Sequence, residues 1–182
     1  MARHGLRRMF VVQYGLTPDA GKALGKIPET SLACVNTHDM PPFAAFLDSL
    51  DVEDRVSLGL LDRKGAGGER RRRRERVRAL TGFLRKRGRL PRTGSRPDDA
   101  TLLRACLAHL AESAAEMVIV NLEDLWRERA PQNTPGTSSE RPNWVRKSRH
   151  SLEEFLALPG VIRTLREIDR IRKEGDPHCD TT

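Results

Sequence analysis

The sequence predicts an α/β protein with parallel β-strands, because three short apolar runs are separated by segments of helical periodicity. The runs are Met9–Tyr14, Ser31–Asn36 and Glu116–Leu122. The third run is the most apolar, and we expect it to be buried on both faces, as parallel strands commonly are. Three strands make a small sheet for 182 residues, so the chain is expected to form part of a larger fold.

Two of the predicted helices follow the second strand, one at residues 42–50 and one at residues 98–111. The start of the second helix is clear, because Pro97 suits a first turn and Asp98 and Asp99 complement the helix dipole. Its apolar positions recur at helical spacing and predict a buried stripe. The stripe consists of Leu103, Cys106, Leu107 and Leu110.

A third helix is predicted over residues 69–86, with Val77, Leu80 and Leu84 on its buried side and a strongly basic outer face. This arginine-rich segment accounts for much of the net charge of +8. A solvated helix face is one interpretation, and a phosphate-contacting patch is the other. The second interpretation gives an alternative function, a basic nucleic-acid-binding α/β domain. No motif for base readout accompanies the patch, so we do not expect nucleic acid to be a partner.

The C-terminal third begins with a polar loop over residues 130–150. Ser151 and Glu154 then form a capping-box signature for a final helical stretch, which Pro159-Gly160 interrupts. We predict one unit over residues 1–174 and a disordered tail over residues 175–182.

The composition is that of a protein with an ordinary core, since 37% of the residues are hydrophobic. No apolar run approaches the roughly 20 residues that span a bilayer, and no signal-peptide segment precedes Met9, so we expect a cytoplasmic protein without a membrane partner. The three cysteines are far apart, which indicates neither a disulfide framework nor a zinc site. Cys34 and Cys106 lie in apolar patterns and are predicted to be buried.

Each predicted strand ends in polar residues. The first ends at Gln13, the second at Asn36 and Thr37-His38-Asp39, and the third at Asn121 and Glu123-Asp124. Because the carboxyl ends of parallel strands lie at the same edge of a sheet, these groups should face a common cleft.

The pair His38-Asp39 is open to three interpretations. Asp39 lies just before Pro41-Pro42, where a helix-capping carboxylate is common. His38, Asp39 and Glu123 could instead form a metal site. In the third interpretation, the carboxylate binds sugar hydroxyls and stabilises positive charge at an anomeric carbon, while the imidazole donates to another hydroxyl. Spacing alone does not choose among them.

Three segments follow one another in the order "MFVVQYG", "ACVNTHD" and "MVIVNLEDLWRERAPQNTPGTSSERPNW". In this order they resemble the C-terminal portion of the amylomaltases, the 4-α-glucanotransferases of glycoside hydrolase family 77. The resemblance runs from about Gly5 to Lys173, and the arginine-rich helices are least alike. It implies that the three strands are the last three of a partial (β/α)₈ TIM barrel.

The resemblance also implies roles for residues. Asp39 matches the carboxylate that stabilises the transition state, and His38 matches a residue that binds the same glucose unit. The further substrate-binding residues that it implies are Thr37, Gln13, Asn133, Pro135 and Gly136. Trp144 would either stack on a sugar or hold its loop against the barrel. The implied substrate is an α-1,4-glucan or maltooligosaccharide, and no cofactor and no metal ion are implied.

Two features depart from the family pattern. Met40-Pro41-Pro42 follows the Thr-His-Asp triplet where the family has Asn-Asp-Thr, so donor and acceptor preference are not predicted. The nucleophilic aspartate and the acid/base glutamate of the family lie on earlier strands, which have no counterpart here. Glu123-Asp124 follows the wrong strand for the acid/base role. We therefore expect the isolated chain to be an inactive fragment whose partner is the missing N-terminal part of the barrel. A non-catalytic glucan-binding remnant is the alternative.

Overall fold

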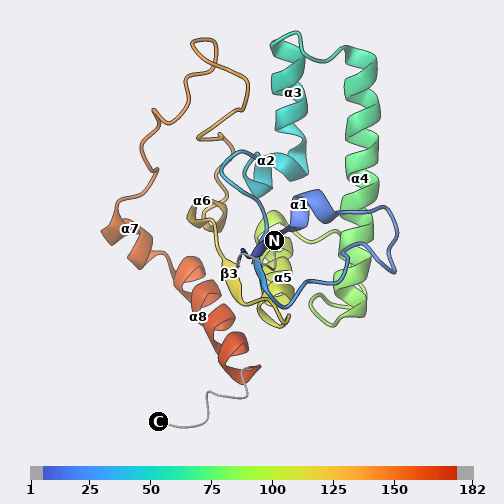
Figure 1. Ribbon diagram of the computed structural model, residues 1–182, viewed down its shortest axis with the longest axis vertical. Coiled ribbons are helices and arrows are strands. Elements are labelled where there is room, and N and C mark those ends of the chain that lie inside the picture. Colours follow the sequence, from blue (N-terminus) through green and yellow to red (C-terminus); the bar gives the residue numbers. More distant parts are fainter. Residues whose placement is uncertain (1–5, 176–182) are drawn as a thin grey trace.

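The computed structural model (Figure 1) describes residues 6–175. Over these residues it contains one three-stranded parallel sheet. The strands β1 (Arg8–Val11), β2 (Ser31–Cys34) and β3 (Met117–Ile119) lie in the order β1-β2-β3. This confirms the predicted α/β class and its parallel strands. The first strand is shorter than predicted, because the chain turns at Val12 into the short helix α1 (Val12–Gly15). The predicted tail beyond Gly175 lies outside the described residues.

One face of the sheet packs on the hydrophobic core and the other is open. Phe10, Ala33 and Val118 are aligned across the strands on the core side, and Ala33 is completely buried. Side chains alternate along a strand, so Met117 and Ile119 point to the opposite side, where they are 52% and 44% exposed. The prediction that the third strand is buried on both faces is therefore wrong. β3 is an edge strand covered on one side.

The segment after β2 forms two helices where one was predicted over residues 42–50. Helix α2 (Phe43–Asp48) ends at Ser49, whose φ of 62° is in the left-handed region, and α3 (Leu50–Ser57) continues in a new direction. The amide of Ser49 donates to the Phe46 carbonyl at 3.1 Å, which closes the end of α2. Helix α3 was not predicted from the sequence.

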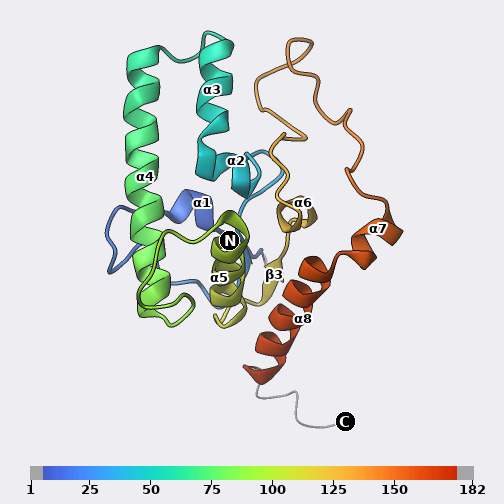
Figure 2. The same cartoon turned by 180° about the vertical axis from the view of Figure 1, so that it is seen from behind.

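Helix α4 (Arg63–Lys86) is longer than the predicted 69–86. Asp62 caps it by accepting a hydrogen bond from the Gly65 amide at 2.7 Å, and Ala66 in the first turns is buried. Cap and burial together offset the weak helix propensity of the glycines in this region. Figure 2 shows α3 and α4 as an antiparallel pair that extends away from the sheet.

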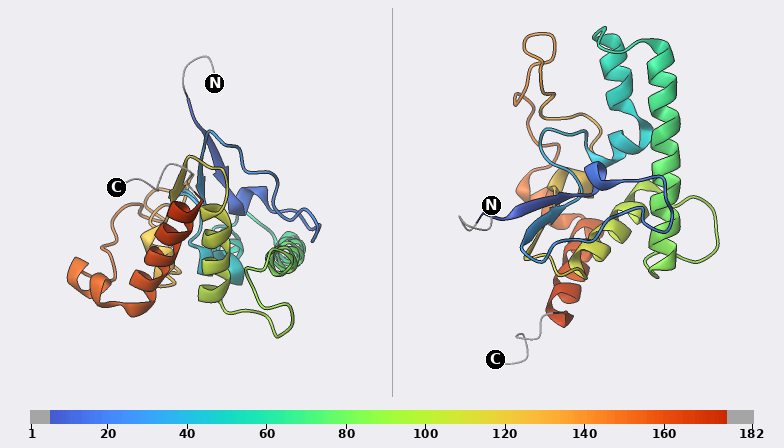
Figure 3. Two further views of the ribbon diagram at one scale, coloured as in Figure 1. Left: turned by 90° about the horizontal axis from the view of Figure 1, so that it is seen from below. Right: turned by 45° about the vertical axis from the view of Figure 1, so that its right-hand side comes forward.

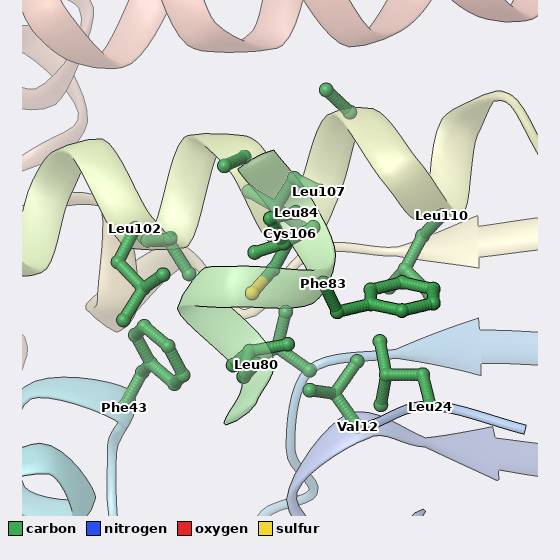
Figure 4. Packing of buried hydrophobic residues seen from close by; sticks show 14 of the residues in the cluster. Val12, Leu24, Phe43, Leu80, Phe83, Leu84, Leu102, Cys106, Leu107 and Leu110 are labelled. Carbon is green, nitrogen blue, oxygen red and sulfur yellow. The ribbon is translucent and has the colours of Figure 1, made fainter. Parts of the chain in front are cut away.

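Helix α5 (Asp99–Ala111) lies in the middle of the core and confirms the predicted helix and its stripe. Figure 4 shows Leu84 of α4 beside Cys106 and Leu107 of α5, with Val12 and Phe43 completing the packing. Cys106 is fully buried, and this burial raises its thiol pKa to about 12. Cys34 is buried as well, so the prediction for both cysteines is confirmed.

The C-terminal helices are α6 (Leu122–Leu125), α7 (Leu152–Ala157) and α8 (Pro159–Glu174). The predicted capping box of Ser151 and Glu154 is present, and α7 and α8 are separate helices as the Pro159-Gly160 pair predicts. Helix α8 contacts α5 on the side away from α4 (Figure 3). Within the described residues, no helix combines the length and the apolar character that crossing a membrane requires.

Candidate functional site at the carboxyl ends of the strands

The polar groups after β2 and β3 contact one another directly. The Asn36 amide donates from Nδ2 to Asp124 Oδ2 at 2.9 Å, and Asn121 Nδ2 donates to Asn36 Oδ1 at 3.3 Å. Asn121 in turn begins α6 by accepting from the Glu123 amide. The carboxyl ends of these two strands therefore meet as the topology predicts.

The end of β1 joins this arrangement through Gln13. Its Nε2 donates to the Pro41 carbonyl at 3.2 Å, and Asn36 Nδ2 lies 3.5 Å from the same oxygen. Gln13 is buried, which places it underneath the loop between β2 and α2. In this structure Gln13 supports that loop, and its predicted contact with a substrate stays a prediction.

Asp124 is the residue that holds the start of α2. Its Oδ1 accepts a hydrogen bond from the Phe43 amide at 2.6 Å, and the N-cap residue Pro42 has no side-chain cap. Proline has no N–H, so Phe43 carries the first free amide of α2. The carboxylate of Asp124 is thus the cap that the sequence analysis considered for Asp39, and the capping interpretation of Asp39 is wrong.

The environment of Asp124 perturbs its titration. The pKa of Asp124 is raised from 3.8 to about 6, chiefly by burial and to a smaller extent by the neighbouring Glu123, while the bonds from Phe43 and Asn36 act in the opposite direction. Sequence reasoning missed this positioning role. The signal that could have found it is the Pro-Pro pair, which leaves a helix start in need of an acceptor.

His38 and Asp39 project from the same loop into solvent-accessible space. His38 Nε2 lies 3.3 Å from Asp39 Oδ1, and the same carboxylate oxygen accepts from Asn133 Nδ2 at 2.5 Å. The indole of Trp144 lies with its centroid 5.6 Å from the His38 ring, tilted by 48°. The structure therefore brings together four residues that the sequence analysis singled out, from segments about a hundred positions apart.

The loop that contributes Asn133 and Trp144 is closed by its own hydrogen bonds. The Trp144 amide donates to the Gln132 carbonyl at 2.8 Å, and the Thr134 amide donates to Asn143 Oδ1 at 2.8 Å. Gly136 occupies the turn with a φ of 83°, a conformation that favours glycine. Arg141 donates from Nε to Asp54 of α3 at 2.7 Å, which ties the loop to the α3–α4 pair.

Two cavities border the His38-Asp39 loop. The first, of about 400 Å³, has Cys34 and Ile119 of the open sheet face in its wall, and its polar lining consists of Asn36, Thr37, His38, Asn121, Glu123 and Gln132. Trp144 also lines it. The second, of about 500 Å³, includes Asp39, Asn133 and Pro135. Neither lining contains Gln13 or Gly136.

The chemistry available at this site is hydrogen bonding with an exposed aromatic surface. The Glu123 carboxylate accepts from Gln132 Nε2 at 2.7 Å, so it is fixed at the wall of the first cavity. Over residues 6–175, no three His, Cys, Asp or Glu side chains are grouped so as to hold a metal ion. The metal interpretation of His38, Asp39 and Glu123 is therefore not supported. Carboxylate, imidazole, amide and indole groups are the usual partners of sugar hydroxyls and sugar rings.

The fold and the cleft define an α/β protein with a candidate site at the carboxyl ends of its parallel strands. The amylomaltase from Corynebacterium glutamicum, known from its crystal structure, superposes with a TM-score of 0.74 at 20% identity, over 92% of this chain and 26% of that one. The family profile described as 4-alpha-glucanotransferase matches residues 1–152. The chain belongs to this family, glycoside hydrolase family 77.

Curated relatives agree with this assignment. The 4-alpha-glucanotransferase of Mycobacterium tuberculosis (strain ATCC 25618 / H37Rv) is 33% identical over 145 residues, which cover 77% of this chain. That of Haemophilus influenzae is 29% identical over 143 residues, or 76% of this chain. The chain spans about one fifth of the length of these relatives.

Proposed function

We propose that this chain forms the glucan-binding side of the active site of a 4-α-glucanotransferase, which transfers α-1,4-glucan segments to an acceptor sugar with retention of configuration. The observation that carries the proposal is the arrangement of Asp39, His38, Asn133 and Trp144 around one loop at the strand ends. Family membership supports this activity over the alternative of a nucleic-acid-binding domain. A cytoplasmic location stays a prediction.

In this proposal Asp39 stabilises the oxocarbenium-like transition state by binding sugar hydroxyls, and it is neither nucleophile nor proton donor. The bond from Asn133 fixes the carboxylate, so little reorganisation is needed when charge develops. His38 and Thr37 would bind the same glucose unit from the first cavity, and Trp144 would stack on a sugar ring.

The second cavity would accommodate neighbouring glucose units. Asn133 and Pro135 line it together with Asp39, and Gly136 gives the loop its turn. Gln13 would act from below by holding the Pro41 carbonyl. A glucan crossing the His38-Asp39 loop would then contact both cavities.

The three strands would be the last three of a (β/α)₈ barrel, with the open sheet face directed into the barrel. The exposed apolar side chains of Met9, Met117 and Ile119 support this placement, because a barrel interior is filled by such side chains. The strands that complete the barrel would carry the nucleophile and the acid/base, which must lie about 5–5.5 Å apart in a retaining enzyme. Whichever polypeptide carries these strands is the predicted partner.

Incubation of the purified chain with maltotriose tests whether the nucleophile and the acid/base come from outside this chain. We expect neither glucose nor maltooligosaccharides longer than maltotriose above the background of a blank, because Asp39 alone supplies only one of three catalytic groups. Robust disproportionation would contradict the proposal that the other two come from elsewhere. A second sample is the chain after it has been completed with its missing strands. If this complex binds maltooligosaccharides without transferring them, the chain is the non-catalytic remnant considered above.

A further inference from the structure

A cavity of about 520 Å³ alongside α4 is lined by four arginines. Arg74, Arg78 and Arg85 come from α4, and Arg96 comes from the loop between α4 and α5. The rest of the lining is apolar or small and consists of Ala20, Leu47, Val77, Thr81 and Gly82. Among the described residues, no carboxylate lines this cavity.

The helix itself explains why the guanidinium groups converge. Positions 74, 78 and 85 are spaced by four and seven residues, so their side chains lie along one face of α4. Arg85 Nη2 donates to the carbonyls of Gly94 and Ser95 at 3.0 and 2.8 Å, which brings the Arg96 loop against the helix. Its Nε is buried and has no hydrogen-bond partner among the described residues.

Two other arginines of α4 have acidic partners. Arg70 pairs with Glu53 and Arg73 pairs with Asp51, both on α3. Within residues 6–175, none of the four arginines that line the cavity forms an ion pair with a carboxylate. The cavity therefore concentrates positive charge that the protein itself does not neutralise.

We propose that this cavity binds a phosphate monoester of a small organic molecule. Guanidinium groups present paired N–H donors that match phosphate oxygens, and a dianion neutralises more of the local charge than a carboxylate does. The apolar part of the lining, Leu47, Val77 and Ala20, provides a surface for the carbon skeleton of the ester. The volume lies within the range of small-molecule sites. The site is separate from the strand ends and does not depend on the proposed glucan chemistry.

Isothermal titration calorimetry with inorganic phosphate, glucose 6-phosphate and glucose tests the proposal on the full chain. Both phosphates are expected to bind and glucose is not. The double variant Arg74→Gln/Arg78→Gln is expected to weaken phosphate binding roughly tenfold or more, because it removes charge-assisted hydrogen bonds. Both residues are exposed, and circular dichroism checks that the variant keeps its helices.

The matched control is Arg72→Gln/Arg76→Gln. It removes the same charge at the same spacing on the same helix, and both residues are exposed. A shift of two residues along a helix turns the side-chain direction by about 200°, so Arg72 and Arg76 point away from the cavity. We expect this variant to bind phosphate like the wild type. Absence of phosphate binding, or equal loss in both double variants, would overturn the proposal.

Two further measurements separate a phosphate monoester from other anions. Glucose 6-phosphate should bind more tightly at pH 7.5 than at pH 5.5, because its second ionisation has a pKa of about 6 and arginine stays charged throughout. A 12-base-pair DNA duplex serves as competitor. If the duplex binds, depends equally on Arg72 and Arg76, and is not displaced by glucose 6-phosphate, then the basic face of α4 is a nucleic-acid surface and the proposal fails.

Discussion

Asp124 connects the ends of two strands with the start of α2 and is only 3% exposed. Its pKa of about 6 in the folded chain is above its ordinary value of 3.8. The folded protein therefore binds more protons than the unfolded chain between these values, and this group's contribution to the free energy of unfolding falls as the pH rises. The contribution is fully present below about pH 4 and decreases by about 3 kcal/mol by pH 7.

The variant Asp124→Asn should remove this dependence, because an amide oxygen can still accept from Phe43 and carries no charge. Urea denaturation between pH 4 and pH 7.5 measures the free energies of unfolding. The variant's free energy minus that of the wild type is expected to rise by about 3 kcal/mol over this range. The control is Asp169→Asn, which removes an exposed carboxylate on α8 and leaves Asp124 in place. Its pH profile shows the effect of the other titratable groups. Parallel profiles for Asp124→Asn and wild type would refute this explanation.

At the level of single residues, the sequence predicted the members of the cluster better than their contacts. Asp39, His38, Asn133 and Trp144 were selected from motifs, and the structure brings them together. The role of Asp124 was not predictable from spacing. Its partner Phe43 lies 81 positions away, and no local pattern indicates which carboxylate reaches a distant helix start.

Among the elements, α5 depends on the cap that Asp98 provides. Its carboxylate accepts from the Thr101 amide at 2.7 Å, and this bond lowers the pKa of Asp98. Asp98→Ala should lower the free energy of unfolding by about 1 kcal/mol at pH 7. Because the pKa is lowered in the folded state, this cost should disappear as the pH falls below the range in which Asp98 ionises.

A control for this prediction is Asp169→Ala, which removes a surface carboxylate paired with Lys173. We expect that change to stay within about 0.5 kcal/mol, since such pairs contribute little in water. Thermal or urea unfolding of both variants makes the comparison. An equal effect of the two substitutions would mean that the cap does not stabilise α5.

The helices were predictable where the signal lies within the helix itself. The cap and apolar stripe of α5 and the Ser151–Glu154 box needed no tertiary information. Helix α3 was missed because the break at Ser49 depends on a left-handed conformation that serine seldom adopts. The start of α4 was placed six residues late, because the glycines argued against a helix and the Asp62 cap was overlooked.

For the whole molecule, the open sheet face has a consequence in solution. Met9, Met117 and Ile119 are exposed on it, and β1 and β3 are edge strands with unpaired backbone groups. Such a surface favours association. Sedimentation velocity should show a rising average mass with protein concentration, and Met9→Gln/Met117→Gln should reduce this effect.

The control for this measurement is Leu152→Gln/Leu156→Gln, which removes two exposed leucines from α7. That pair lies away from the sheet, so we expect association to persist. A wild-type chain that stays monomeric at high concentration would count against an incomplete barrel. The error about β3 arose because an apolar run indicates a parallel strand but not its place in the sheet, and β3 lies at an edge where one face is exposed.

The most direct test is to measure the binding of maltoheptaose to the purified chain by calorimetry. We predict saturable binding that Asp39→Ala and His38→Ala each weaken roughly tenfold. Glu29→Ala is the control, since Glu29 is exposed just before β2, at the opposite end of the strand from the cleft. It should leave binding unchanged. Absence of maltoheptaose binding, or binding that neither Asp39→Ala nor His38→Ala affects, would contradict the assignment of this cleft to a glucan.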